Sequence, residues 1–373
     1  MKWFRTTPFS ADHETQRQEK WQCQREDGAV FDFDVNVRSG KSLDVVALKG
    51  LDLAELRGYA EFLQKTARQL YGAGSPLRKI AHCPCCGAET GHFNKKALTV
   101  FGIDYFRCRQ CGHVFVQEQP TLEAHQKLFS ESESHSATYV DKDALELRLR
   151  QVVVPKLEWC VEQFSNLHTG KRPSSLVDVG AGGGHFLSVA ARSGMSVEGF
   201  ELSKSSRAFA RQNFGLSLND GDFLTTDLAP VDLVTFWGLL EYVSDPAPFL
   251  EKAREILHPD GMLVVEVPRA DALGTAVQSL PDAVVGRHMD PTSHIQAFSD
   301  ESLMTLLFKA RFQPVAVWYF GMDVYEALVQ AAVRVNSASI LESMAELIPK
   351  LQESVDLGRQ CDDIIVAAVP IEN

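Results

Sequence analysis

The residues with the clearest potential for chemistry form a glycine-rich turn in the middle of the chain. The apolar run Leu176–Val179 contains one acid, Asp178, and is followed by Gly180–Gly184, in which only Ala181 is not glycine. Apolar residues return at helical spacing from Phe186 to Ala190, which predicts a buried strand, a turn and a helix. Glycine permits positive φ angles and lets a ligand approach the main chain more closely than a Cβ allows. The turn is therefore a candidate ligand cradle.

The residues around this turn help to separate two kinds of ligand. A dinucleotide-binding turn also begins Gly-x-Gly after a strand, but here His185 occupies the place of the third glycine in that pattern. The carboxylate of Asp178, two residues before Gly180, repels a pyrophosphate and suits a cationic ligand or its ammonium group. We therefore favour a cationic ligand, and the alternative is an ordinary tight turn without a ligand.

This pattern resembles the first motif of the class I S-adenosylmethionine-dependent methyltransferases. The resemblance covers about Leu176 to Pro370 and implies an α/β fold with a Rossmann-like, seven-stranded methyltransferase sheet, and S-adenosyl-L-methionine as cofactor. Glu201 ends the second expected strand, where a carboxylate can accept both ribose hydroxyls, and the resemblance makes it the ribose ligand. The implied cofactor-binding residues are Asp178, Gly180, Ala181, Gly182, Glu201, Leu202, Asp222, Phe223, Trp237 and Gly238.

Two of these pairs have expected roles within the family pattern. Asp222 and Phe223 fill the adenine-binding turn, where the acid accepts from the exocyclic amine and the backbone and ring of the next residue hold the base. Trp237 and Gly238 line the methionine end of the cofactor. Tyr139, at the end of a polar, serine-rich stretch, is an aromatic residue that could close over the bound cofactor.

A candidate general base lies after the fifth expected strand. The segment His294–Ser299 resembles the His-x-x-x-Phe-Ser segment of methyltransferases that join a zinc-binding region to this fold, among them deoxysugar C-methyltransferases. Those enzymes have Glu-His at this point, whereas Ser293 precedes His294 here. The sulfonium already activates the methyl group, so the protein must align a nucleophile and remove one proton. His294 is the first candidate, followed by His288 and Tyr242, and the alternative is that His294 only makes structural hydrogen bonds.

A second group with metal-binding potential is a cluster of cysteines. Of eight cysteines, five fall between Cys83 and Cys111, and two Cys-x-x-Cys-Gly turns place Cys83 with Cys86 and Cys108 with Cys111. Two such knuckles can hold one tetrahedral Zn²⁺, so we expect a structural zinc ribbon. Pairing of Cys83 with Cys85 and free thiols without metal are the alternatives.

Four regions position these residues. We expect an α+β accessory module over 1–76, the zinc ribbon over 77–120, and a linker and packing helix over 121–172. The methyltransferase domain then spans 173–373, with alternating strands and helices and a helical insertion near 324–357. Within the first module, Val30–Val37 alternates apolar and polar residues, and Arg38–Lys41 offers a turn before Leu43–Leu48, which together predict a hairpin.

Composition limits the function classes. The chain has 373 residues and a formal net charge of −12, which argues against a general nucleic-acid binder. It contains no apolar run long enough to cross a bilayer and no signal peptide, so we expect a cytoplasmic enzyme without membrane insertion. The expected acceptor is a small molecule, namely a sugar, nucleotide-sugar or surface glycan, and a homodimer is possible. The alternatives are a nucleic-acid-modifying methyltransferase guided by the ribbon and a cofactor-binding scaffold without catalysis.

Overall fold

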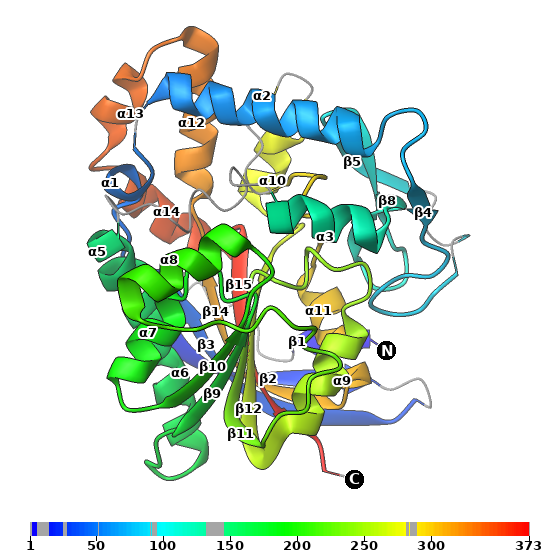
Figure 1. The fold of residues 1–373 in the computed structure, drawn as a ribbon, viewed down its shortest axis with the longest axis vertical. Helices are drawn as coiled ribbons and strands as arrows, with labels where there is room; N and C mark the ends of the chain where they lie inside the picture. The colour runs from blue at the N-terminus through cyan, green and yellow to red at the C-terminus, as the bar shows by residue number, and fades with distance from the viewer. Residues whose placement is uncertain are drawn as a thin grey trace.

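One mixed sheet of nine strands runs through the molecule in the order β1-β2-β3-β14-β15-β12-β11-β9-β10 (Figure 1). The structure is a computed structural model that describes residues 2–5, 15–24, 28–50, 52–89, 91, 95–131, 145–280, 283 and 289–372. The strands of the sheet are β1 (Lys2–Arg5), β2 (Gln16–Gln24), β3 (Val30–Ser39), β9 (Ser175–Val179), β10 (Ser196–Phe200), β11 (Val231–Trp237), β12 (Leu257–Pro268), β14 (Phe312–Phe320) and β15 (Asp363–Pro370).

Six of these strands confirm the predicted Rossmann-like α/β arrangement. β10, β9, β11 and β12 are parallel, and β15 lies antiparallel between β12 and β14. Helices α7 (His185–Arg192), α8 (Lys204–Phe214) and α9 (Ala247–Ile256) lie between the parallel strands in sequence, as parallel crossovers require. The sheet differs from the predicted seven strands in two ways: β1, β2 and β3 join it, and the segment before Asp220 makes only an isolated bridge from Asn219 to Phe200.

The amino-terminal strands extend this sheet at its far edge. β2 and β3 form a hairpin that differs from the predicted one: Val30–Val37 lies in β3, but its partner is β2 and not Leu43–Leu48, most of which lies in α1 (Val45–Lys49). β3 then pairs in parallel with β14, with Asn36 opposite Ala316. The pairing is favourable because Val35 and Val37 of β3 are buried in the same core as Val317 and Tyr319 of β14. The hairpin is therefore part of the main sheet and does not form a separate one.

Two apolar layers cover the two faces of the sheet. On one face α9 and α11 (Asp300–Lys309) pack against alternate residues of β11, β12, β14 and β15, whereas on the other face α6 (Val154–Leu167) and α7 do so. α6 follows α5 (Leu145–Arg148) and a π-helical turn, η2 (Leu149–Val153), which precedes Pro155, a residue without an N–H to donate. The parallel strands are thus buried on both sides, and their carboxyl ends form one accessible edge.

A helical layer lies above that edge (Figure 1). It contains α1 (Val45–Lys49), α2 (Leu53–Leu70), α12 (Asp323–Val335), α13 (Ser339–Met344) and α14 (Ile348–Leu357), which share one apolar cluster. Helices lie in the region near 324–357, where we expect an insertion, and the second part of this region is divided into α13 and α14. The division falls before Pro349, which stands in the first turn of α14 because proline disrupts a helix interior.

The cysteine-rich segment forms a small β module beside the sheet. β5 (Lys95–Val100), β6 (Ile103–Arg107) and β7 (Val114–Val116) are antiparallel, and β13 (Gln296–Ala297) joins them as a fourth strand. β4 (Leu77–Lys79) pairs with β8 (Glu118–Pro120), and the remaining helices are α3 (Leu122–Glu131) and α10 (Leu273–Gln278). Among the described residues, no helix combines the length and apolar character needed to cross a membrane.

Candidate active site

The glycine turn lies where β9 ends, at the accessible edge of the sheet. The amides of Gly180 and Ala181 both donate to the carbonyl of Phe200 at 2.9 Å, which fixes the turn against the end of β10. Gly180 has φ of +74°, and a Cβ there would stand 3.2 Å from Leu239. His185, at the start of α7, is buried against Phe209, and burial lowers its pKa to about 4. His185 is therefore a neutral core residue and not part of the cradle.

The carboxylate of Glu201 faces this turn from the tip of β10. Its Oε2 accepts from the amide of Gly182 at 2.7 Å, and its Oε1 accepts from the amide of Ser203 at 2.6 Å. Burial raises the pKa of Glu201, although these two amides partly oppose the increase. Each carboxylate oxygen has a further lone pair, so the side chain can also accept two ribose hydroxyls. The residues therefore fit the predicted ribose contact.

Asp178 is more deeply buried than Glu201. Its side chain is buried, and Thr235 of β11 donates to its Oδ1 at 2.7 Å. Burial raises the pKa of Asp178 to about 7, against the opposing effect of the Thr235 hydrogen bond. A buried carboxylate is stabilised by a nearby cation, so the chemistry of this position suits a ligand that carries positive charge.

The predicted adenine turn has one exposed and one buried residue. Asp222 is exposed, and its Oδ1 accepts from the amide of Leu224 at 3.0 Å. The ring of Phe223 packs among other aromatic rings, those of Phe200, Phe236 and Phe249, and only 3% of this residue is exposed. This packing leaves the backbone of Phe223, and not its ring, available to contact an adenine base.

The remaining predicted cofactor residues surround the ends of β10 and β11. Leu202 is exposed, and Gly238 has φ of +66° at the end of β11. The ring of Trp237 lies against Phe186 and under the Lys156 ammonium, 4.7 Å from its centre. The buried indole Nε1 of Trp237 has no hydrogen-bond partner in the part of the chain that the structure describes. Tyr139 lies outside the described residues.

Two of the three candidate bases come together at the same edge. His294 Nε2 lies 3.2 Å from the Tyr242 hydroxyl, and the two rings meet edge to face at 5.0 Å. The third candidate, His288, lies outside the described residues. Glu241, which sequence reasoning missed, is also present, with its Oε1 3.9 Å from His294 Nε2. The only sequence signal was its position beside Tyr242, because 52 residues separate Tyr242 from His294.

A hydrogen-bonded chain joins this pair to the ribbon. Gln296, two residues after His294, donates to the carbonyls of Leu240 and Val243 at 2.6 and 2.5 Å, on either side of Glu241 and Tyr242. The Gln296 side-chain oxygen lies 2.7 Å from His113 Nε2 of the ribbon. Tyr105 of β6 also donates to the carbonyl of His294 at 2.8 Å. The ribbon therefore contacts the backbone of the candidate base and the side chain of Gln296, two residues after it.

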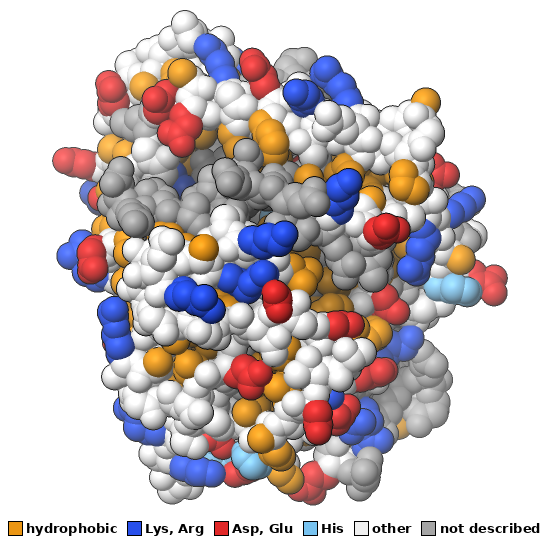
Figure 2. Space-filling view, viewed as in Figure 1, with side chains coloured by type: hydrophobic (Ala, Val, Ile, Leu, Met, Phe, Trp, Pro, Cys, Tyr) orange, Lys and Arg blue, Asp and Glu red, His pale blue; other side chains and the backbone are white. Residues whose placement is uncertain are grey.

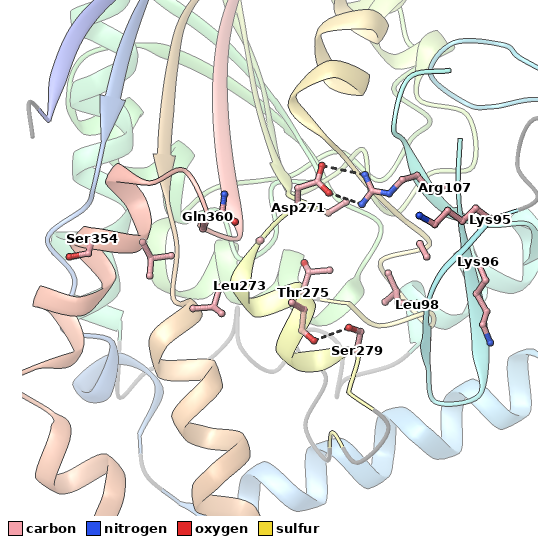
Figure 3. A pocket seen from close by; sticks show the side chains of 15 residues that line it. Lys95, Lys96, Leu98, Arg107, Asp271, Leu273, Thr275, Ser279, Ser354 and Gln360 are labelled. Carbon is pink, nitrogen blue, oxygen red and sulfur yellow. Dashed lines mark hydrogen bonds and ion pairs between the residues drawn. The ribbon is translucent and has the colours of Figure 1, made fainter. Parts of the chain in front are cut away.

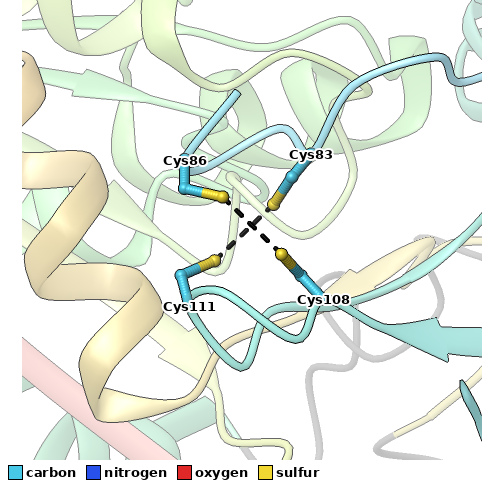
Figure 4. A group of neighbouring side chains, drawn as sticks. All are labelled: Cys83, Cys86, Cys108 and Cys111. Atoms are coloured by element: carbon cyan, nitrogen blue, oxygen red, sulfur yellow. Dashed lines mark hydrogen bonds between the residues drawn. The ribbon is translucent and has the colours of Figure 1, made fainter. Parts of the chain in front are cut away.

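Four cysteine side chains converge in the ribbon (Figure 4). The sulfurs of Cys83, Cys86, Cys108 and Cys111 all lie within 4.8 Å of one another. The Cys83–Cys111 and Cys86–Cys108 sulfur pairs are each 3.6 Å apart. A tetrahedral ion with ligand bonds of about 2.3 Å places its sulfurs about 3.8 Å apart, so the cluster fits zinc. The four-residue set is the predicted one, and Cys85, which is also buried, is not part of it.

A cleft of about 820 Å³ opens between the ribbon, α10 and α14 (Figure 3). Lys95, Lys96 and Arg107 line the ribbon side, and Leu273 lies on the opposite side. Arg107 Nη2 pairs with Asp271 at 2.6 Å and so links the ribbon to the chain after β12. The backbone of Ala270, which lines the cleft, donates to the carbonyl of Phe298 at 2.8 Å, in the strand segment that follows His294.

Comparisons with known proteins find methyltransferases. Two ubiquinone biosynthesis O-methyltransferases are similar to the chain. The one from Actinobacillus pleuropneumoniae serotype 5b is 30% identical over 28% of this chain and 48% of its own length. The one from Cereibacter sphaeroides is 27% identical over 38% of this chain and 60% of its own length. The chain therefore spans about half the length of the curated relatives it matches. The magnesium protoporphyrin IX methyltransferase of Synechocystis PCC 6803, solved with bound SAH, aligns with 67% of this chain and 100% of its own, at 12% identity and a TM-score of 0.45.

The family comparison is confined to the middle of the chain. The family model described as a methyltransferase domain matches residues 158–317, which include the glycine turn, Glu201 and His294. These residues contain β9, β10, β11 and β12, whose carboxyl ends carry the candidate site. The match to the methyltransferase domain therefore covers the part of the chain that carries the candidate site.

Proposed function

We propose that the protein transfers a methyl group from S-adenosyl-L-methionine to a hydroxyl of a small molecule. The observation that supports this most directly is the position of the Glu201 carboxylate over the amides of Gly182 and Ser203, beside the glycine turn. The domain match and the names of the similar O-methyltransferases support methyl transfer to oxygen. When bound, the cofactor supplies a methyl group activated by a sulfonium.

The protein's own residues then have separate tasks. Glu201 and the backbone of Gly180–Gly182 bind and orient the cofactor, and Asp178 supplies negative charge below it. His294 takes the proton of the acceptor hydroxyl, and the Tyr242 hydroxyl positions its imidazole. Cys83, Cys86, Cys108 and Cys111 hold a structural Zn²⁺ that stabilises the ribbon.

We propose a sugar or nucleotide-sugar as the finer class of acceptor. The cleft beside the ribbon is within the size range of small-molecule sites, and Lys95 provides a cation for a phosphate-bearing part of the acceptor. Nucleic acid is a poor alternative. Lysine, arginine and acidic side chains are interspersed on the face seen in Figure 2, and Arg107 already pairs with Asp271.

Calorimetry on the purified chain tests the cofactor. We expect S-adenosyl-L-methionine and its demethylated product to bind, and Glu201→Gln to weaken binding roughly 10- to 100-fold, because an amide cannot replace a carboxylate that accepts two backbone N–H groups. Glu198→Gln, an exposed acid on the same strand, is the matched control and should bind normally. Heat of binding for a nicotinamide nucleotide, with none for S-adenosyl-L-methionine, would overturn the proposal.

The acceptor is then identified by mass spectrometry. The protein is incubated with S-adenosyl-L-methionine and a panel that contains nucleotide-sugars, free sugars and ring-hydroxyl compounds. A mass increase of one methyl group on a sugar supports the finer proposal. Methylation of a ring hydroxyl alone supports the general proposal but rules out the sugar class. Methylation of RNA or DNA alone rules out both.

A further inference from the structure

Glu241 is a buried acid that none of the roles above uses. It lies in the turn after β11, is 3% exposed, and has one carboxylate oxygen 3.9 Å from His294 Nε2. Its other oxygen, Oε2, is buried and has no hydrogen-bond partner among the described residues. A buried carboxylate without full hydrogen bonding is costly, so a purely structural role does not explain it.

The Glu241 carboxylate lies close to the backbone of its own turn, at Gly238. Gly238 has φ of +66°, and a Cβ on Gly238 would stand only 3.0 Å from Glu241 Oε1. The amide of Tyr242 donates to the carbonyl of Leu239 at 3.0 Å, which closes the turn. Gln296 holds the carbonyls of Leu240 and Val243 on either side of Glu241. Gln296, two residues after His294, therefore fixes the turn that carries Glu241.

The charges around Glu241 come from several elements. Burial raises its pKa well above the ordinary value, and the nearby acids Asp363 of β15 and Glu266 of β12 raise it further. The Lys156 ammonium of α6, which forms an ion pair with Glu266, acts in the opposite direction. His294 and Tyr242 complete the surroundings. A proton on His294 would place a positive charge beside Oε1, which opposes the raised pKa and favours the carboxylate form of Glu241.

We infer that Glu241 is a positioning residue for the proposed reaction, whose carboxylate holds the His294 imidazole in place and stabilises the imidazolium. This role rests on the proposed function. In the step, the acceptor O–H bond breaks and its proton goes to His294, while the acceptor oxygen forms a bond to the methyl carbon. The carbon–sulfur bond breaks and its electron pair stays on sulfur. The positive charge of the sulfonium is thereby transferred to the imidazolium, next to Glu241.

Glu241 can replace the acid that is missing at Ser293, the residue before His294. The acid that precedes the histidine in the similar sugar methyltransferases is absent, and the Ser293 hydroxyl donates to Asp290 Oδ2 at 2.6 Å instead. Glu241 supplies a carboxylate from a different strand end. The same chemical pair is thus assembled across 53 positions of sequence.

The variants that test this inference differ in charge and in reach. Glu241→Gln keeps the shape and removes the negative charge, and Glu241→Asp keeps the charge on a shorter side chain. Glu326→Gln is the matched control, because Glu326 is 2% exposed and lies on α12, outside the candidate site. His294→Ala defines the rate without the base, and its kcat should fall about 10²- to 10⁴-fold.

Two measurements are made on these variants. We expect Glu241→Gln to lower kcat about 10²-fold with unchanged cofactor binding. The acid limb of its pH–rate profile should move to lower pH, because a carboxylate favours the protonated imidazole and its removal lowers the pKa of His294. Glu241→Asp should restore part of kcat and keep the limb near its wild-type position. Wild-type kinetics, or an unshifted limb, in Glu241→Gln would overturn the inference.

An NMR titration of His294 separates this inference from the proposed function. It follows the pKa of the imidazole in wild type, Glu241→Gln and Glu326→Gln, and it needs no turnover. A lower pKa in Glu241→Gln alone supports the pairing even if no acceptor is methylated, in which case only the proposed function fails. An unchanged pKa with normal cofactor binding overturns the pairing and leaves the proposed function intact.

Discussion

At the residue scale, the candidate site depends on three carboxylates with different surroundings. Glu201 accepts from two backbone amides, Asp178 accepts from one hydroxyl, and Glu241 faces an imidazole. Hydrogen bonding and burial determine how readily each group keeps its negative charge. Because the three environments differ, one edge of the sheet can bind sugar hydroxyls, attract positive charge and support proton transfer.

Asp178 gives the free protein a measurable pH dependence. Its folded-state pKa is raised to about 7, above an unfolded value of about 3.9, so the folded state holds one more proton between these pH values. The stability that this proton contributes is fully present below the unfolded pKa and is lost as the pH rises through the folded pKa. Asp178→Asn should therefore be more stable than wild type at pH 8, by no more than about 4 kcal/mol.

Denaturant unfolding at pH 5 and pH 8, without cofactor, measures this effect. The stability of Asp178→Asn relative to wild type should increase between the two pH values, whereas cofactor binding at pH 8 should weaken. Asp227→Asn, at an exposed position, is the control and should show no such change. An equal stability difference at both pH values would contradict the burial of an ionisable Asp178.

At the element scale, the ribbon pairs with the short strand that follows the candidate base. β13 pairs with β7, so Gln296 and Ala297 stand opposite Phe115 and Val114. Ser299 donates to the carbonyl of Cys111 at 3.1 Å, and Lys309 donates to the carbonyl of Cys86 at 2.6 Å. Both cysteine turns therefore contact the segment between His294 and the end of α11.

Loss of the zinc should affect methyl transfer more than cofactor binding. Chelation, or Cys108→Ser, should lower kcat about 10²-fold, because a small displacement of the base is enough to disturb alignment. Cofactor affinity should persist, since β9, β10 and β11 lie outside the ribbon. Hydrogen exchange should increase at 294–298 and stay unchanged in β9.

Metal content provides the control for this experiment. Wild type and Cys85→Ala should each carry one zinc per chain by atomic absorption, because Cys85 is outside the four-sulfur cluster. A zinc-free Cys85→Ala protein would show that the metal ligands are different. Unchanged exchange at 294–298 after chelation would show that the ribbon does not support the base.

At the scale of the whole molecule, an ion pair joins segments from opposite ends of the sequence. Glu19 of β2 is 5% exposed and pairs with Arg359, which follows α14 and is 4% exposed. Trp21 Nε1 and Arg17 Nε also donate to the Glu19 carboxylate at 2.9 and 2.7 Å. Burial alone would raise the pKa of Glu19, but Arg359 and these two donors outweigh it and lower the pKa.

Breaking this ion pair should destabilise the entire sheet. Glu19→Gln should reduce the free energy of unfolding by about 3–5 kcal/mol at pH 7, because it leaves the buried Arg359 without its counter-charge. This contribution is present above the unfolded pKa of Glu19 and is lost as the pH falls through the folded pKa. Denaturant midpoints at pH 7 measure it. Asp32→Asn, an exposed acid on β3, should change stability by less than about 0.5 kcal/mol. Equal midpoints for the two variants would contradict the role of the pair.

Local patterns account for what could be predicted from the sequence. The strand, turn and helix around Gly180 and the two Cys-x-x-Cys turns were recognisable because each depends on residues within a few positions of one another. The contact of Glu241 with His294 and the parallel pairing of β3 with β14 join distant segments, and periodicity carries no information on such pairs. We expected the ring of Phe223 to contact the adenine base, because the motif does not show that neighbouring aromatic rings bury the Phe223 ring.

The place of β3 beside β14 has a consequence for synthesis on the ribosome. Asn36 lies opposite Ala316, so the hairpin of β2 and β3 is made 280 residues before its neighbour in the sheet. At translation rates of about 5–20 residues per second, the nascent hairpin waits roughly 15 to 60 s with the apolar side chains of Phe33, Val35 and Val37 uncovered. During that interval we expect the emerging chain to depend on a chaperone that shields this face until the last strands arrive.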